Sequence, residues 1–207
     1  MLEKKSVKTN ITRKTAIILL AAGKSTRFAG GNKLSHELLG VPLLTHCYNS
    51  IKYSKVAQIV VVSSQENLKQ AETLSNPYPK IAFVEDNELG IGHSISIGMG
   101  FIREEISSVV ICLADMPLIT NVHIQLLLDA NKTSYFNQIH RLYDVNNMFG
   151  HPILFNSYYF PKLKRLNGDQ GAYDITLNNK DLINIIKVNN ISVSTDIDTN
   201  KDWDNLI

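Results

Sequence analysis

The residues best suited to chemistry lie in one glycine-rich segment, which runs from Leu20 to Lys33 directly after an apolar stretch. Glycine lets backbone N–H groups approach phosphate oxygens, and cationic side chains such as Arg27 and Lys33 neutralise phosphate charge. A loop that follows the first buried strand also lies where α/β proteins bind ligands. The segment therefore predicts a polyphosphate-binding loop, with an exposed basic loop as the alternative.

Two common phosphate motifs do not account for this segment. Gly23-Lys24-Ser25 resembles the end of a Walker A loop, but that motif needs a glycine five residues earlier, where Ile18 stands. The dinucleotide pattern of three glycines at G-x-G-x-x-G spacing is also missing from the loop. The loop thus belongs to another class of phosphate site.

A carboxylate follows the apolar run that ends at Leu113, in the stretch Ala114-Asp115-Met116-Pro117. Asp115 is expected at the carboxyl end of a central strand, where open α/β sheets bind ligands. One or two carboxylates, completed by water and phosphate oxygens, suit Mg²⁺. Asp115 is therefore a candidate metal ligand; the alternative is that it caps the following turn.

Three further segments combine glycine with polar residues, and a fourth, near the C-terminus, is rich in aspartate. Ser94 is predicted to cap a helix after Gly90 and Gly92. Gly150-His151-Pro152 is interpreted as a tight turn into a strand at Ile153–Phe155. Gly168, Asp169 and Gly171 precede a predicted helix, for which Asp169 could simply be the N-cap. Asp198 lies in Asp196-Ile197-Asp198-Thr199, and Thr199 with Asp202 could form a capping box.

Apolar runs and helix-length segments must position these residues. Strands are predicted at Thr15–Leu20, Gln58–Ser63, Ile81–Val84, Ser108–Leu113, Gln138–Tyr143 and Ile183–Val188. Helices are predicted near Leu43–Tyr53, Glu66–Leu74, Ser94–Glu104 and Asn121–Asn131. Runs that are apolar on both faces are typical of a parallel sheet covered by helices. The βαβαβ order predicts a doubly wound α/β fold with a mostly parallel central sheet, in which residues 1–14 are a flexible lead-in and 15–207 a single domain.

Composition narrows the class of protein. The net charge of +2 gives no argument for nucleic acid or membrane as a partner. No apolar run reaches the roughly 18 residues of a membrane span, and residues 1–14 lack the apolar core of a secretory signal. Cys47 and Cys112 fall in apolar segments, which indicates unpaired core cysteines in a reducing, cytoplasmic compartment.

Taken in order, these motifs resemble those of the nucleotidyltransferases that attach a nucleotide to molybdenum cofactor, and most closely the molybdenum cofactor cytidylyltransferases. The shared pattern is a Leu-Ala-Ala-Gly loop, a Gly–Ser–Gly stretch, Asp-x-Pro, Gly-x-Pro, Leu-x-Gly-Asp-x-Gly-Ala and a terminal Asp-Ile-Asp-Thr. It covers about residues 15 to 205. The resemblance implies a three-layer, Rossmann-like nucleotidyltransferase fold. It also implies transfer of CMP from CTP to the phosphate of Mo-molybdopterin, with Mg²⁺ as cofactor and a molybdoenzyme or its maturation chaperone as a possible partner.

The resemblance also assigns roles by position. Catalysis falls to Arg27, Lys33 and Asp115, and metal binding to Asp115 with Asp198, or Asp169 in its place. Nucleotide contacts are expected at Leu20, Ala21, Ala22, Gly23, Lys24, Ser25, Arg27, Lys33, Gly92 and Ser94. Acceptor contacts are expected at Gly150, His151, Pro152, Gly168, Asp169 and Gly171.

Two positions keep alternatives open. Ala22 is typical of the cytidylyl branch, whereas Met116 is more often found in the guanylyl branch. Tyr173 stands where the family generally has an arginine, which removes a cation from the expected acceptor site. One alternative is therefore a related nucleotidyltransferase that uses GTP or another phosphorylated acceptor. The other is a protein that binds nucleotide or molybdenum cofactor without turnover.

Overall fold

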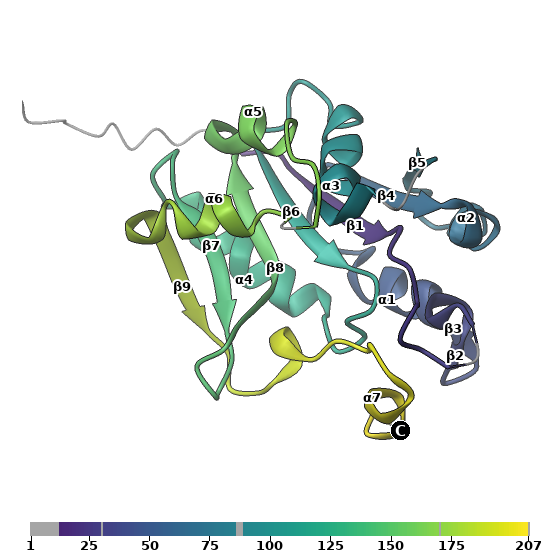
Figure 1. The fold of residues 1–207 in the computed structure, drawn as a ribbon. Coiled ribbons are helices and arrows are strands. Elements are labelled where there is room, and N and C mark those ends of the chain that lie inside the picture. Colours follow the sequence, from purple (N-terminus) through teal and green to yellow (C-terminus); the bar gives the residue numbers. More distant parts are fainter. Residues whose placement is uncertain (1–12, 30, 86–88, 170, 207) are drawn as a thin grey trace, which may run out of the picture.

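A seven-stranded sheet forms the centre of the molecule in this computed structural model (Figure 1), which describes residues 13–29, 31–85, 89–169 and 171–206. The strand order is β5-β4-β1-β6-β8-β7-β9. The strands are β1 (Thr15–Ala21), β4 (Gln58–Ser64), β5 (Lys80–Val84), β6 (Ser108–Leu113), β7 (Ile139–Tyr143), β8 (Phe149–Asn156) and β9 (Ile183–Lys187). A separate pair, β2 (Glu37–Leu38) and β3 (Val41–Pro42), follows the glycine-rich loop.

The predicted mostly parallel sheet is confirmed. β1 pairs in parallel with β4 and β6, and β4 pairs in parallel with β5. Only β8 runs against its neighbours β6 and β7, while β9 pairs in parallel with β7. Strand order reverses at β1, since the chain goes to β4 on one side and returns to β6 on the other. The carboxyl ends of β1 and β6 therefore flank the crevice where such sheets bind ligands.

Helices cover both faces of the sheet, which confirms three layers. One face packs against α1 (Leu43–Ile51), α2 (Gln65–Glu72), α4 (Asn121–Lys132) and α7 (Asn200–Asp204). The other packs against α3 (Gly90–Gly100), α5 (Phe160–Leu163) and α6 (Tyr173–Leu177). Short 3-10 turns lie at Lys33–Ser35, Ser157–Tyr159, Lys180–Leu182 and Ser192–Ser194.

Side chains of β1 alternate between the two cores. Ile17 and Leu19 join the first core, and Ile18 and Leu20 join the second. This alternation is the two-residue period of a strand, and it explains why an apolar run with no polar face becomes the central strand. Cys47 and Cys112 are buried and unpaired, as predicted.

Several local predictions need correction. Gly150-His151-Pro152 is not a turn but part of β8, which is longer than predicted and begins at Phe149. Helix α3 begins at Gly90, so Ser94 lies in its second turn and is not the N-cap. Asp169 does not cap α6 either, because that helix begins at Tyr173 after Ala172. The capping box of Thr199 and Asp202 is confirmed at the start of α7.

The predicted lead-in also extends too far. The guanidinium of Arg13 donates hydrogen bonds to Asn131 and Ser134 at the end of α4. The carbonyl of Lys14 accepts one from the N–H of Ser107 before β6. Both residues are therefore held to the domain, and residues 1–12 lie outside the described residues.

Among the described residues, no helix combines the length and the apolar character needed to cross a membrane.

Candidate active site

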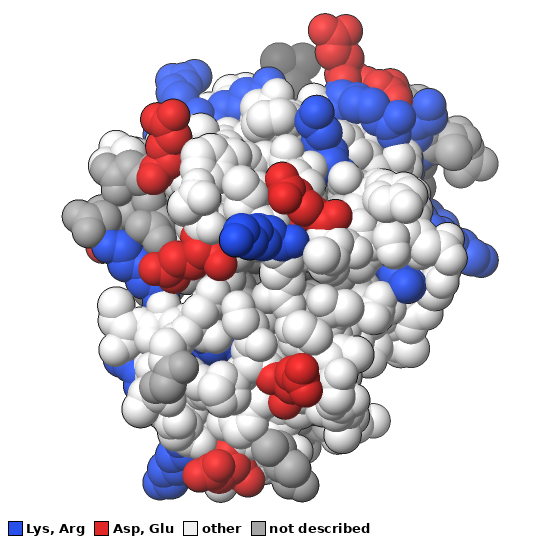
Figure 2. Space-filling view, turned by 90° about the vertical axis from the view of Figure 1, so that its right-hand side faces the viewer, with Lys and Arg blue, Asp and Glu red and all other residues white. Residues whose placement is uncertain are grey.

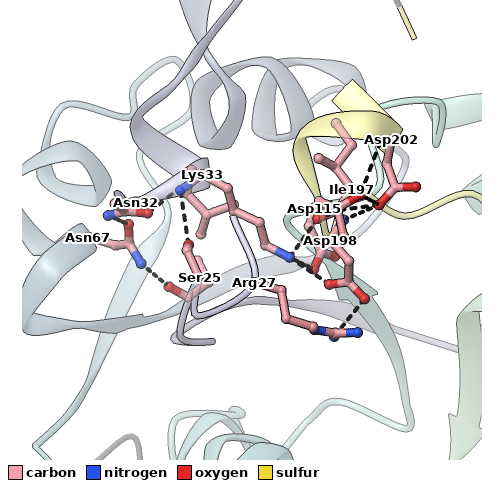
Figure 3. Close-up of polar contacts among 12 residues, drawn as sticks. Ser25, Arg27, Asn32, Lys33, Asn67, Asp115, Ile197, Asp198 and Asp202 are labelled. Carbon is pink, nitrogen blue, oxygen red and sulfur yellow. Dashed lines mark hydrogen bonds and ion pairs between the residues drawn. The ribbon is translucent and has the colours of Figure 1, made fainter. Parts of the chain in front are cut away.

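A buried lysine ammonium is the centre of the site. Lys33 Nζ donates to Asp115 Oδ2 at 2.7 Å, to the carbonyl of Ile197 at 2.7 Å and to Asp198 Oδ1 at 3.1 Å (Figure 3). Its side chain is only 8% exposed. Arg27 forms an ion pair with the other oxygen of Asp198 at 2.7 Å. Four charged groups from three distant segments thus form one alternating chain of charges.

The carboxyl ends of β1 and β6 bring two of these segments together. Asp115 follows β6, and the loop with Lys33 follows β1. The third segment is the C-terminal one, which crosses from β9 to the loop after β1 (Figure 1). The N–H of Ile197 donates to the carbonyl of Asp115 at 2.9 Å, and Asn200 bonds the backbone of Ala29 in both directions. These bonds fix Asp198 beside Lys33.

Polar side chains hold the lysine end of the loop. The hydroxyl of Ser25 accepts a hydrogen bond from the N–H of Lys33 at 2.9 Å, and Asn32 caps the short turn through the N–H of Leu34. Asn67, completely buried on α2, bonds Asn32 and donates to the carbonyl of Ala21 at 2.9 Å. Asn67 therefore ties the loop to the end of β1 and sets the place of Lys33.

A cavity of about 610 Å³ opens beside these charges. Its lining includes Leu20, Ala22, Gly23, Lys24, Thr26, Lys33, Leu34, Gly90, Ile91, Ser94, Leu113, Asp115, Asp169 and Asp198. The loop supplies one wall, the start of α3 the opposite one, and the carboxylates the end. A cavity of this size, with apolar walls and a few polar groups, suits a nucleotide.

Burial and charge act in opposite directions on Lys33. Burial lowers its pKa, but Asp115 and Asp198 more than offset this, so the pKa of Lys33 is raised and the group remains an ammonium. The nearby Asp196 has its pKa raised by burial and by the negative charges of Asp198 and Asp115. The end of the cavity therefore has more negative charge than Lys33 alone neutralises.

The carboxylates are suited to a divalent cation. Asp115 Oδ1 is buried and has no hydrogen-bond partner among the described residues. The described residues hold no group of three or more His, Cys, Asp or Glu side chains able to bind a metal. Two carboxylates with oxygen sites left for phosphate and water match the preference of Mg²⁺ rather than a site made of protein alone.

Most predicted nucleotide contacts lie on this cavity, with four exceptions. Ala21 is buried in the core instead. Ser25 acts through the backbone of Lys33. The side chain of Arg27 is 70% exposed and reaches Asp198. The N–H of Gly92 donates to the carbonyl of Gly168 at 2.8 Å. Ser94 lines the cavity, with its hydroxyl 3.5 Å from the carbonyl of Gly90.

The predicted acceptor residues divide into two groups. His151, Asp169 and Gly171 line a second cavity of about 210 Å³ under α3 and α6. Gly150 instead packs on the backbone of Val193, where a Cβ would overlap the carbonyl oxygen. Gly168 is part of the contact with the start of α3, and Pro152 lines neither cavity. The glycine motif at 150 is thus explained by packing.

Four residues at the site escape the sequence prediction. Asn67 and Asn32 are ordinary helix and loop residues in sequence, and only the fold brings them together. In sequence, Asp196 is marked only as part of a terminal motif. Arg141, on β7, lines the second cavity, and no motif marked it.

Charge on the outer surface adds little to this picture. On the face drawn in Figure 2, acidic and basic side chains are interspersed, without an extended field of one sign.

The fold and the site define a class, and comparison with known proteins gives the family. A family model described as the MobA-like NTP transferase domain matches residues 17–182. The chain therefore belongs to this family.

Relatives of known sequence match parts of this chain, and solved structures share its fold. The chain is 32% identical to the purine catabolism protein PucB of Bacillus subtilis over 167 residues, which are 75% of this chain and 77% of PucB. It is 29% identical to the bifunctional protein GlmU of Staphylococcus epidermidis over 118 residues, 56% of this chain, and spans only 26% of GlmU. The crystal structure of Rv0371c from Mycobacterium tuberculosis matches with a TM-score of 0.83 and 20% identity, covering 95% of this chain and 98% of that one. A manganese complex of Rv0371c matches with a TM-score of 0.79, at 19% identity and coverage of 93% and 97%.

Proposed function

We propose that this protein is a molybdenum cofactor cytidylyltransferase that transfers CMP from CTP to the phosphate of Mo-molybdopterin and releases pyrophosphate. The observation that carries the proposal is the convergence of Lys33, Asp115 and Asp198 at the end of a nucleotide-sized cavity. Nucleotidyl transfer brings two anions together, so it depends on positioning and neutralisation more than on an acid or base.

Each charged residue has a task in this reaction. Asp115 and Asp198 would hold Mg²⁺, and the unpartnered oxygen of Asp115 is the position that favours this role. When bound, Mg²⁺ neutralises triphosphate oxygens and orients them. Lys33 and Arg27 would bind the β- and γ-phosphates and stabilise the leaving pyrophosphate. The convergence on Lys33 favours Asp198 over Asp169 as the second ligand, because Asp169 is exposed at the far wall.

The base preference is proposed from position 22. Ala22 lines the cavity, whereas Met116 is buried in the core on the other side of the sheet. A residue in the lining can select a base, while a core methionine is explained by packing. We therefore propose CTP, in a cytoplasmic setting that keeps Cys47 and Cys112 reduced, with a molybdoenzyme or its maturation chaperone as receiver.

The test combines binding and turnover. Thermal unfolding is followed with Mg²⁺ and each of CTP, GTP, UTP and ATP, and pyrophosphate release is then measured with Mo-molybdopterin. A nucleotide at about 100 times its Kd stabilises the fold by about 2.7 kcal/mol. A shift with CTP, followed by acceptor-dependent pyrophosphate release, is the expected result. A shift with GTP alone would make Met116 the better guide to the base.

Tyr173 favours one second candidate, a nucleotidyltransferase with a different phosphorylated acceptor. Pyrophosphate release with a sugar or polyol phosphate and not with Mo-molybdopterin would establish it. Nucleotide binding without pyrophosphate release from any acceptor would instead indicate a binding protein.

A further inference from the structure

A second cavity shares a wall with the nucleotide cavity. Its volume is about 210 Å³, and Ile91 and Asp169 border both spaces. Apolar side chains of α3 and β8, including Ile95, Ile153 and Phe155, form its floor. A small organic group bound here would lie beside a nucleotide in the larger cavity.

Arg141 gives this cavity an unbalanced charge. It projects from β7 into the lining, and its Nε is buried without a hydrogen-bond partner in the part of the chain that the structure describes. No carboxylate of those residues forms an ion pair with it. A buried donor without a partner is costly, and a buried cation more so, unless a ligand satisfies it.

The surroundings fix where the guanidinium lies. It stacks 4.5 Å from the ring centre of Phe149 on β8. Burial lowers the pKa of Arg141, and Tyr173 acts weakly in the opposite direction, which places the phenol near the guanidinium. Arginine nevertheless remains charged at neutral pH. Arg141 is thus a positioned cation in the cavity wall.

The other polar groups of the cavity do not cancel this charge. Burial, with a smaller effect from Arg141, lowers the pKa of His151 to about 4, so this histidine is neutral at pH 7. A neutral imidazole can still donate one hydrogen bond. Asp169 is exposed, so water screens its charge. The cavity therefore suits an anion attached to an apolar or aromatic body.

We infer that Arg141 binds the phosphate of the acceptor, an organic phosphate monoester. The inference rests on the proposed function. The cation that the family generally has at position 173, here Tyr173 on α6, would be supplied instead by Arg141 on β7. In the reaction, a phosphate oxygen of the acceptor bonds to the α-phosphorus of CTP. The bond from that phosphorus to its bridging oxygen breaks, and pyrophosphate leaves with the electron pair. The planar guanidinium can hold two other phosphate oxygens meanwhile.

The first test reads Arg141 directly and does not depend on turnover. The Nε–Hε resonances of uniformly ¹⁵N-labelled protein are recorded while phenyl phosphate is titrated. The Arg141 signal is identified by its loss in Arg141→Gln, and the control signal by its loss in Arg165→Gln, since Arg165 lines a separate surface cavity. A saturable shift of the Arg141 signal, with the Arg165 signal still, is expected. An Arg141 signal that does not move overturns the assignment, even if Arg27 responds.

The second test connects the site to the reaction. With Mg²⁺ and CTP, Arg141→Gln should raise the KM for Mo-molybdopterin at least tenfold and leave the KM for CTP and the CTP-induced thermal shift near wild type. Arg165→Gln should match wild type in all three. An unchanged acceptor KM in Arg141→Gln overturns the acceptor role. A wild-type protein that shows the Arg141 shift but transfers no CMP overturns the proposed function and leaves the phosphate site standing.

Discussion

The two cavities treat charge in opposite ways. At the nucleotide cavity, the buried Lys33 is paired with Asp115 and Asp198, and the exposed Arg27 pairs with Asp198 from outside. In the second cavity, Arg141 has no such partner among the described residues. Ion pairs within the protein hold the first site together before a ligand binds. In the proposed reaction, a triphosphate and its metal would have to replace some of these ion pairs. An unpaired cation needs no exchange, so an anion gains its full attraction at once.

The substitution with the largest expected effect on the nucleotide cavity is at Asp115. Asp115→Asn should reduce turnover by about two orders of magnitude or more, by analogy with the loss of one key electrostatic group. It removes a metal ligand and also a partner of a buried ammonium. Pyrophosphate release at saturating CTP and acceptor measures the effect.

The matched control is Asp129→Asn. Asp129 pairs with Lys132 on the exposed face of α4, away from both cavities. Circular dichroism and Tm should show that both variants are folded. Turnover near wild type in folded Asp115→Asn would remove Asp115 from the metal role.

Two glycines sharpen the contrast between packing and ligand binding. Gly150→Ala drives a Cβ into the carbonyl of Val193, and overpacking of this kind costs about 1–3 kcal/mol or more. At 207 residues that lowers Tm by roughly 2–12 °C. Gly23→Ala meets no described atom within 4 Å, so its Tm should match wild type while its CTP affinity falls. Equal Tm values for the two variants would contradict this division.

The sequence predicts the region around the nucleotide cavity better than the region around the second cavity. The sequence predicts β1, β4, β5 and β6 to within one residue at each end, but not the short strands β2 and β3. The apolar runs of β1, β4 and β6 are buried almost throughout, which is why they are easily recognised. The loop and Asp115 follow directly from those strands. In this half, local sequence and tertiary structure agree.

The second region depends on contacts that sequence does not encode locally. Gly150-His151-Pro152 has the composition of a turn, yet pairing of β8 with β6 and β7 extends the strand through it. Ser94 has the character of an N-cap, but α3 starts four residues earlier, where Gly90 and Gly92 pack on residues 167–169. Arg141 stands in a strand with no motif, and only the neighbouring β8 and α6 give it a cavity. Asn67 likewise contacts the glycine-rich loop only because the fold brings α2 next to it.

Asn67 tests whether the nucleotide cavity depends on this support. Asn67→Ala removes the side-chain donor to the carbonyl of Ala21, and it leaves the amide of Asn32 with only its longer bond to the carbonyl of Glu66. A buried polar group left unsatisfied costs about 1–3 kcal/mol. We expect a lower Tm and a weaker CTP-induced shift, while phenyl phosphate binding at Arg141 is unchanged.

Gln125→Ala is the control for Asn67. Its amide bonds Asp129 on the exposed side of α4, so its removal should change neither Tm nor CTP binding. If Asn67→Ala and Gln125→Ala bind CTP equally well, the tie between α2 and the loop does not position Lys33.

The smallest effect expected is the part of the pH dependence that two histidines of the second region contribute. The pKa of His140 is lowered to about 4 by burial and, to a smaller extent, by the charge of Arg13. The pKa of His151 is lowered to a similar value. An unfolded histidine has a pKa of about 6.5. Below that pH the unfolded chain binds protons that the folded chain excludes, so stability is complete above about 6.5 and falls as the pH decreases toward 4.

Between pH 7 and 6 the loss at His140 is below about 1 kcal/mol, and it grows on further acidification. Urea unfolding at pH 7, 6 and 5 measures it. His140→Gln and His151→Gln should each flatten the dependence of the unfolding free energy on pH. A wild-type slope in both variants would show that other groups carry the acid sensitivity. A slope lost with His140 and His151 would place it in β7 and β8, the strands that carry Arg141.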